Sequence, residues 1–289
     1  MKSERRSGQA FIIEKALMIK KNRKSGQEGT FKKGDELPYT LPRMVYKSKV
    51  ALEDFADRQV IRFTPANDAD KTVIYVHGGA YVSEITQFHV HFCDKLCAQG
   101  DVNVIAPLYG LAPAHTWEEA YPFILALYLE EAEKGKPIVL MGDSAGGGFV
   151  TAFSEYLAEG GYPLPNRVCL ISPWLDITMP LDYSEIIDND PMLDVEELRK
   201  LGALWAGTLD HKDYKVSPTY GDVAKFPPSL IFTGTHEIFK VDIVEFCRKL
   251  ENAGRETELV IAEKMDHVYP LYPIPEAKKA MDTILDWIK

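Results

Sequence analysis

Residues 137–148 read Pro137-Ile-Val-Leu-Met-Gly-Asp-Ser-Ala-Gly-Gly-Gly148, and this stretch decides the fold. After the proline comes a short apolar run, which is typical of a parallel strand buried on both faces. The next five residues fit Gly-x-Ser-x-Gly, a motif that sets a serine at the tip of a strained turn between a strand and a helix. Such a turn points the Ser144 hydroxyl and the first helical amides at one spot. The alternative is a glycine-rich turn without chemistry, so the function depends on partners elsewhere in the chain.

On either side of this stretch the chain alternates between predicted strands and predicted helices. This alternation indicates an α/β fold with a mostly parallel sheet covered by helices on both faces. Apolar runs predict strands at 49–52, 60–63, 71–77, 102–106, 138–141, 167–171, 229–233 and 258–261. Helical patterns lie at 86–99, 116–134, 238–252 and 275–288, and one more helix follows Ser144.

The N-terminal segment, residues 1–48, departs from this alternation. It is basic and uneven, and apolar positions from Phe11 to Ile19 predict one amphipathic helix, with a break at the basic run 20–26. We expect the apolar face of this helix to lie over the main domain as part of a cap. The catalytic domain is then predicted at 49–289.

A second departure falls inside that domain, at about 179–216. No strand pattern is found there, so we predict a helical cap insertion above the sheet. Asp190 precedes Pro191, which is a favourable start for a helix with Asp190 as its N-cap. We expect that helix to run to about residue 206.

The composition restricts the classes of partner. The chain has 289 residues, 46% of them hydrophobic, and a net charge of -10. An acidic surface disfavours nucleic acid and anionic membranes and suits a small neutral substrate. We find neither a signal-peptide pattern nor a run of membrane-spanning length, so stable membrane insertion is not expected. The four cysteines show no CxxC spacing, which favours buried free thiols and a cytoplasmic location.

A serine becomes a nucleophile when a histidine takes its proton and a carboxylate orients that histidine. In this type of fold the expected chain order is serine, acid, histidine. His267 lies in the loop between the last strand and the last helix, where a base could reach the sheet edge. Glu237 stands just beyond the preceding strand and is the predicted acid, whereas Asp242 falls inside the following helix.

The oxyanion of a tetrahedral intermediate needs backbone N–H donors. The amide of Ala145 is one predicted donor, and the loop after the strand at 71–77 is expected to supply others from Gly78, Gly79 and Ala80. Glycine there would let a carbonyl oxygen approach the backbone closely.

Taken together, these motifs make the chain resemble the hormone-sensitive-lipase-like branch of the α/β-hydrolase superfamily, and in particular small bacterial carboxylesterases. The resemblance implies an eight-stranded sheet, a helical cap and hydrolysis of short acyl esters. The sequence departs from the usual family pattern at three positions: Gly110 replaces an arginine, Glu237 an aspartate, and Ala80 a glycine. The matching stretches are 77–81, 107–113, 142–147, 172–178, 234–237 and 266–267.

Other side chains are weaker candidates. Four aromatic residues are predicted to line the substrate site, although each is also consistent with packing: Tyr81, Tyr109, Trp174 and Tyr220. His89, Cys93 and Cys97 recur at helical spacing, which favours a buried helix face over a metal site. Asp188-Asn-Asp190 has part of a calcium-loop pattern, but Leu193 stands where that loop needs glycine.

The predicted function is therefore a serine carboxylesterase that needs no metal and no organic cofactor. Two alternatives stay open at this point: a non-catalytic receptor for small ligands on the same fold, and an amidase or peptidase. The sequence also leaves a homodimer open.

Overall fold

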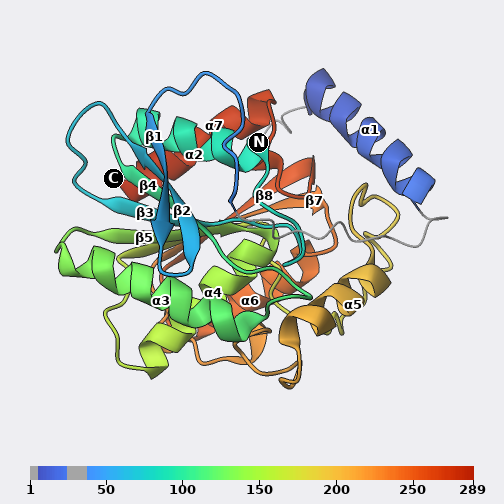
Figure 1. Cartoon of the computed structure of the whole chain (residues 1–289). Coiled ribbons are helices and arrows are strands. Elements are labelled where there is room, and N and C mark those ends of the chain that lie inside the picture. The colour runs from blue at the N-terminus through green and yellow to red at the C-terminus, as the bar shows by residue number, and fades with distance from the viewer. Residues whose placement is uncertain (1–5, 25–37) are drawn as a thin grey trace.

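The computed structural model describes residues 6–24 and 38–289. One sheet of eight strands runs through it, in the order β1-β2-β4-β3-β5-β6-β7-β8 (Figure 1). The β1–β2 and β2–β4 pairs are antiparallel, and every later pair is parallel. The predicted mostly parallel, eight-stranded sheet is confirmed. The strands are β1 (Lys49–Phe55), β2 (Arg58–Thr64), β3 (Thr72–Val76), β4 (Asn103–Leu108), β5 (Ile138–Asp143), β6 (Arg167–Ile171), β7 (Ser229–His236) and β8 (Thr257–Asp266).

Helices cover both faces of the sheet. In Figure 1, α2 and α7 lie on one face, and α3, α4 and α6 lie on the other. Side chains of β5 alternate between the two resulting cores: Ile138 and Leu140 join the α3–α4–α6 side, whereas Val139 and Met141 join the α2–α7 side. This two-residue period is why a strand buried on both faces is a continuous apolar run. The helices are α1 (Gly8–Lys24), α2 (Gln87–Gly100), α3 (Trp117–Glu133), α4 (Ser144–Glu159), α5 (Val195–Ala206), α6 (Lys240–Asn252) and α7 (Pro275–Ile288).

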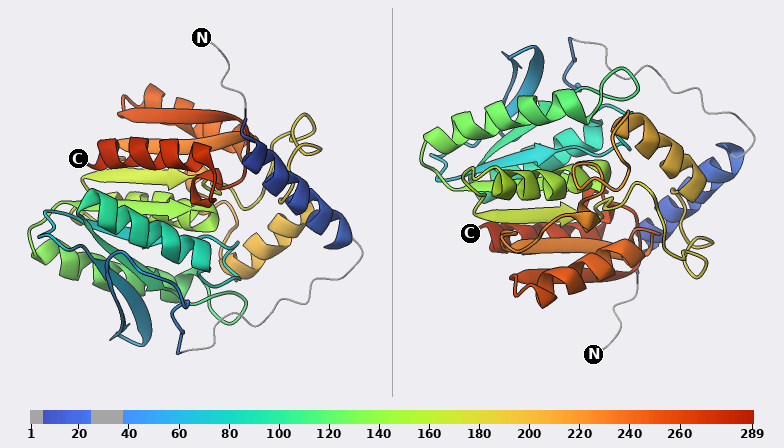
Figure 2. Two further views of the ribbon diagram at one scale, coloured as in Figure 1. Left: turned by 90° about the horizontal axis from the view of Figure 1, so that it is seen from above. Right: turned by 90° about the horizontal axis from the view of Figure 1, so that it is seen from below.

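The parallel strands place all their carboxyl ends at one edge of the sheet. Segments that follow β3, β5, β7 and β8 therefore come together there, although they are far apart in the sequence. Helices α1 and α5 lie beyond this same edge, as the two views of Figure 2 show. Among the described residues, no helix has both the length and the hydrophobicity needed to cross a lipid bilayer.

Helix α1 contacts the domain differently from the sequence expectation. Phe11, Ile12 and Ile19, which were expected to face the domain, are 50%, 67% and 56% exposed. Ala10 and Glu14 are the buried residues, and Glu14 accepts a hydrogen bond from Arg6 and lies 2.7 Å from Nδ1 of His236. The helix also continues to Lys24, through most of the predicted break, and residues 25–37 lie outside the described part of the chain. Both kinds of contact therefore attach this helix: the polar contacts of Glu14, and the apolar packing of Ala10 and Ile13 against the α2–α7 core.

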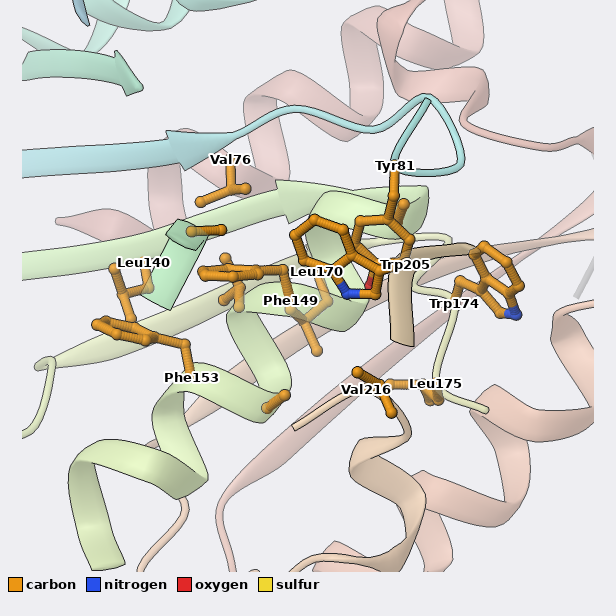
Figure 3. Close-up of a cluster of buried hydrophobic side chains, with 14 of the residues drawn as sticks. Val76, Tyr81, Leu140, Phe149, Phe153, Leu170, Trp174, Leu175, Trp205 and Val216 are labelled. Atoms are coloured by element: carbon orange, nitrogen blue, oxygen red, sulfur yellow. The ribbon is translucent and has the colours of Figure 1, made fainter. Parts of the chain in front are cut away.

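In the insertion, the predicted helix start is wrong by one turn. Helix α5 begins at Val195, and its N-cap is Asp194, whose carboxylate accepts the amide of Glu197 at 2.9 Å. The helix is anchored by Trp205, which stacks on Tyr81 with 4.3 Å between ring centroids and 3° between ring planes (Figure 3). Tyr81 belongs to the loop after β3, so the insertion packs directly on a segment at the edge of the sheet that carries the strands' carboxyl ends.

Candidate active site

Ser144 lies at the sharp turn between β5 and α4. Its φ of 52° is in the left-handed region, which only a strongly constrained non-glycine residue adopts. The neighbouring glycines explain how the turn can form. A Cβ at Gly146 would lie 2.1 Å from the carbonyl oxygen of Val76, and one at Gly142 would lie 2.5 Å from that of Gly146. Side chains at these positions would prevent the helix from packing against the sheet.

The three residues predicted to act together form one hydrogen-bonded chain. Nε2 of His267 lies 2.8 Å from Oγ of Ser144, and its Nδ1 lies 2.6 Å from Oε2 of Glu237. All three side chains are buried, Glu237 completely. Burial alone would lower the pKa of His267, but the hydrogen bond and charge of Glu237, with further charges from Asp190 and Asp143, raise it above its ordinary value. The imidazole therefore accepts a proton more readily than an isolated histidine.

The second oxygen of Glu237 is held by three donors. The hydroxyls of Ser172 and Thr233 donate to Oε1 at 2.8 and 2.6 Å, and the amide of Gly234 donates at 2.8 Å. Ser172 also accepts the amide of Val268, next to His267, at 3.1 Å. Sequence reasoning gave Ser172 and Thr233 no role. The sequence feature that could have indicated a role for them is their position, because each lies at or beside the carboxyl end of a parallel strand.

The loop after β3 faces the serine turn. Gly79 has a φ of 122° and Ala80 a φ of 53°, and within the described part of the chain no hydrogen bond uses their amides. Gly78 differs, because its amide donates to Oδ1 of Asp143 at 2.9 Å. That amide is therefore occupied, in contrast to the expectation that it faces an oxyanion. A Cβ at Gly78 would lie 2.4 Å from Oδ2 of Asp143, so the position admits only glycine.

Asp143, the residue before Ser144, anchors this loop. Besides Gly78, its carboxylate accepts the hydroxyl of Tyr75 at 2.6 Å and lies 3.3 Å from Nε2 of His89. Burial would raise the pKa of Asp143, but His89, Tyr75 and the Gly78 amide outweigh burial and lower it. His89 is thus a partner of a buried carboxylate. Cys93 and Cys97, at helical spacing from it, are buried free thiols. No group of three side chains suited to metal binding is found among the described residues.

Three of the four aromatic residues predicted to line the substrate site lie in the protein interior. Tyr81 and Trp174 are almost fully buried and stack on each other at 5.7 Å. Trp174 stacks in turn on Phe239, which packs edge-on against the ring of His267 at 5.2 Å. The hydroxyl of Tyr109 donates to the carbonyl oxygen of His77 at 2.9 Å and so fixes the start of the loop after β3.

Tyr220, the fourth, lies elsewhere. It is 42% exposed and lines a cavity of about 450 Å³ together with Glu155, Tyr214 and Asp222. None of Ser144, Glu237 and His267 lines that cavity. Both carboxyl oxygens of Glu155 lack a hydrogen-bond partner in the described part of the chain.

Gly110, which replaces the arginine expected from the resemblance, has a local packing reason. A Cβ there would lie 2.6 Å from both Cβ and Cγ of His115. The side chain of His115 therefore occupies the space that any larger residue at 110 would need.

A family model with the description alpha/beta hydrolase fold matches residues 73–271. The chain belongs to this family. It is 29% identical over 224 residues to an acetyl-hydrolase from Streptomyces hygroscopicus, covering 75% of each chain, and 28% identical over 226 residues to an esterase from Acinetobacter venetianus, covering 76% of this chain and 75% of that one. Among solved structures, a hormone-sensitive lipase from a metagenome library has a TM-score of 0.83 and 26% identity, covering 96% of this chain and 97% of that one. The resemblance to the hormone-sensitive-lipase-like branch is confirmed.

Asp242, the rejected candidate for the acid, lies on α6, where the hydroxyl of Tyr183 donates to both of its oxygens at 3.2 and 3.0 Å. Burial raises the pKa of Asp242 to about 7. In the unfolded chain this carboxyl ionises near pH 4. As pH rises from about 4 to about 7, ionisation of Asp242 increasingly favours the unfolded state over the folded state. Above about pH 7 its contribution to the unfolding free energy no longer changes with pH.

We therefore expect Asp242→Asn to be more favourable to stability at pH 8 than at pH 4, because the amide keeps an acceptor for Tyr183 and carries no charge. The difference in unfolding free energy, variant minus wild type, should become more positive by roughly 1–4 kcal/mol across that range. Urea unfolding followed by circular dichroism at several pH values measures it. Asp282→Asn, at an exposed position of α7, is the matched control and should show little change with pH. A difference that is the same at pH 4 and pH 8 would contradict the assignment of a raised pKa to Asp242.

Proposed function

We propose that the protein is a serine carboxylesterase that hydrolyses short-chain acyl esters through a covalent acyl-enzyme. The observation that carries this proposal is the buried hydrogen-bonded chain from Ser144 through His267 to Glu237. It faces a loop in which the amides of Gly79 and Ala80 have no acceptor among the described residues. The relatives named acetyl-hydrolase and esterase support the same class of reaction.

In the first step Oγ of Ser144 attacks the ester carbonyl carbon, and Nε2 of His267 takes the hydroxyl proton. The carboxylate of Glu237 keeps the Nδ1 proton in place and stabilises the imidazolium that forms. The raised pKa of His267 favours this transfer, because the charged form of the ring is stabilised before the substrate arrives.

The oxyanion that develops on the carbonyl oxygen would be bound by the amides of Gly79, Ala80 and Ala145. One such donor contributes about 2.7–4 kcal/mol to the stability of the transition state. His267 then gives its proton to the leaving alcohol and the acyl-enzyme forms. A water molecule activated by the same nitrogen attacks the acyl group, releases the acid and restores Ser144.

Two observations support short acyl groups. The stacked rings of Tyr81, in the loop after β3, and of Trp174 and Trp205 form a buried aromatic wall. A relative in the same family is named an acetyl-hydrolase. The net charge of -10 favours a neutral ester over an anionic one.

Ser144→Ala should abolish hydrolysis of p-nitrophenyl acetate, lowering kcat by about 10⁴-fold or more. Among the described residues, the hydroxyl hydrogen-bonded to Nε2 of His267 is that of Ser144. Covalent labelling by a fluorophosphonate, detected by mass spectrometry, should disappear in parallel. Ser184→Ala, an exposed serine of the insertion, is the control and should keep both properties. Full turnover by the Ser144 variant would refute the proposal.

Glu237→Gln tests the acid separately. Three donors surround Oε1, so the amide oxygen of glutamine should take that place and its NH₂ group should face His267. Nδ1 of His267 would then have to accept a hydrogen bond from this NH₂ group, so the ring proton would lie on Nε2. In that tautomer Nε2 cannot take the proton of Ser144. We expect kcat to fall by up to about 10⁴-fold with little change in folding. Steady-state kinetics beside Glu251→Gln, an exposed change on α6, measure the effect, and equal rates for the two variants would exclude Glu237 as the orienting acid.

The acyl specificity can be measured with p-nitrophenyl esters from acetate to decanoate. We expect kcat/KM to be highest between acetyl and hexanoyl and to fall for longer chains, because the buried aromatic wall cannot move aside without losing its stacking. Values that keep rising to decanoate would contradict the short-chain assignment while leaving the serine mechanism intact.

A further inference from the structure

Asp190 connects the cap insertion to the segment that carries the proposed acid. Its carboxylate is buried and accepts three backbone amides. Oδ1 accepts those of Met192 and Leu193, both at 2.8 Å, and Oδ2 accepts that of Ile238 at 2.8 Å. Ile238 follows Glu237 directly in the chain. A side chain in the insertion therefore fixes the main chain beside the acid from a position 48 residues earlier.

The other side of the same turn is held by α1. Nζ of Lys21 donates to the carbonyl oxygens of Asp190 and Leu193 at 3.0 and 2.6 Å. Figure 2 shows α1 beside the coil that precedes α5. The turn at 190–193 thus lies between the N-terminal helix and the Glu237 segment, with hydrogen bonds to both.

The bond to Ile238 is not part of the local turn. A turn closed by an aspartate needs one carboxylate oxygen to accept the amides two and three residues later, and Oδ1 does this alone. Helix α5 has its own N-cap in Asp194, so Asp190 is not required to start that helix. The second oxygen is therefore available to accept the amide of Ile238, in the segment after β7.

The charge of Asp190 also acts on the base. Burial has the largest effect on the pKa of His267 and lowers it. The hydrogen bond and charge of Glu237 raise this pKa, and the charge of Asp190 raises it further by a smaller amount. Asp143 adds to the same effect from the sheet, and Asp266 is a further buried carboxyl that faces His267, Glu237 and Glu14. Burial raises the pKa of Asp190 itself, and its three amide donors and His267 oppose that increase.

We propose that Asp190 is a positioning residue for Glu237, and that the turn at 190–193 transmits the placement of helix α1 to the hydrogen-bonded chain that ends at Ser144. The proposal rests on the esterase function proposed above. Full activity would then require that helix α1 and the insertion contact each other and the domain as described, because Glu237 is aligned by a side chain of the insertion as well as by the sheet.

The first test is Asp190→Asn. Asparagine has one acceptor oxygen and cannot serve both the local turn and Ile238, so Glu237 should lose its alignment. We expect kcat for p-nitrophenyl acetate to fall about tenfold with KM changed less than about twofold. The acid limb of the kcat/KM profile should move to lower pH, because removing a negative charge lowers the pKa of His267.

Asp188→Asn is the matched control, since it removes the same charge from an exposed position two residues away. It should keep the wild-type kcat and pH profile. A wild-type kcat and an unmoved acid limb in Asp190→Asn would overturn the proposal, and so would equal losses in the two variants. Ser144→Ala in the same assay separates the questions: if it is active, the esterase mechanism fails, whereas if it is inactive and Asp190→Asn is normal, only the positioning role fails.

A second pair of variants covers the case in which Asp190→Asn does not fold, judged by circular dichroism. Lys21→Met removes the contact from α1 and leaves the carboxylate in place, and Lys15→Met removes an exposed charge from the same helix. We expect a severalfold lower kcat in Lys21→Met only. Identical kcat values for the two lysine variants would overturn the link between α1 and the acid.

Discussion

The rest of the site depends on one carboxylate that has no access to water. Burying a charge is costly unless donors replace the lost hydration. Glu237 is completely buried, and its two oxygens receive hydrogen bonds from His267 and from three donors on β7 and after β6. These donors can meet only if β6, β7 and β8 are neighbours with their carboxyl ends aligned, which is the order observed. The carboxylate of Glu237 can therefore receive its hydrogen bonds only when this edge of the sheet has formed.

The sequence predicted the sheet well because its strands obey a local rule. A strand buried on both faces is a continuous apolar run through most of its length, and β5 and β6 show this at residues 138–141 and 168–171. The turn at Ser144 was predictable for a similar reason, since a Cβ at position 142 or 146 would lie only 2.5 or 2.1 Å from a backbone oxygen, so glycine is needed there. Ser144, Glu237 and His267 followed from chain order at one edge, and the structure brings all three together.

The predictions that failed concern hydrogen-bond and packing partners that are far apart in the sequence. Asp190 has the local signature of an N-cap, but Asp194 has it too, and only the fold shows which of them caps α5. The amide of Gly78 was expected to be free, yet Asp143 occupies it from the neighbouring strand. On α1, Glu14 is buried and Phe11 is exposed because His236 of the domain, together with Arg6 just before the helix, gives the carboxylate polar partners there. Composition and periodicity hold no information about such pairings.

Asp143 and Asp190 make the same kind of contact with two different segments of the site. Each is a buried carboxylate that accepts a backbone amide next to a functional segment: Gly78 in the loop after β3, and Ile238 after Glu237. Asp143 belongs to the central strand β5, so the loop that supplies the proposed oxyanion donors is set by the core of the sheet. Asp190 belongs to the insertion, which α1 contacts through Lys21. The donor side of the site should therefore be rigid whenever the domain is folded, whereas the alignment of the acid should depend on how the cap is docked.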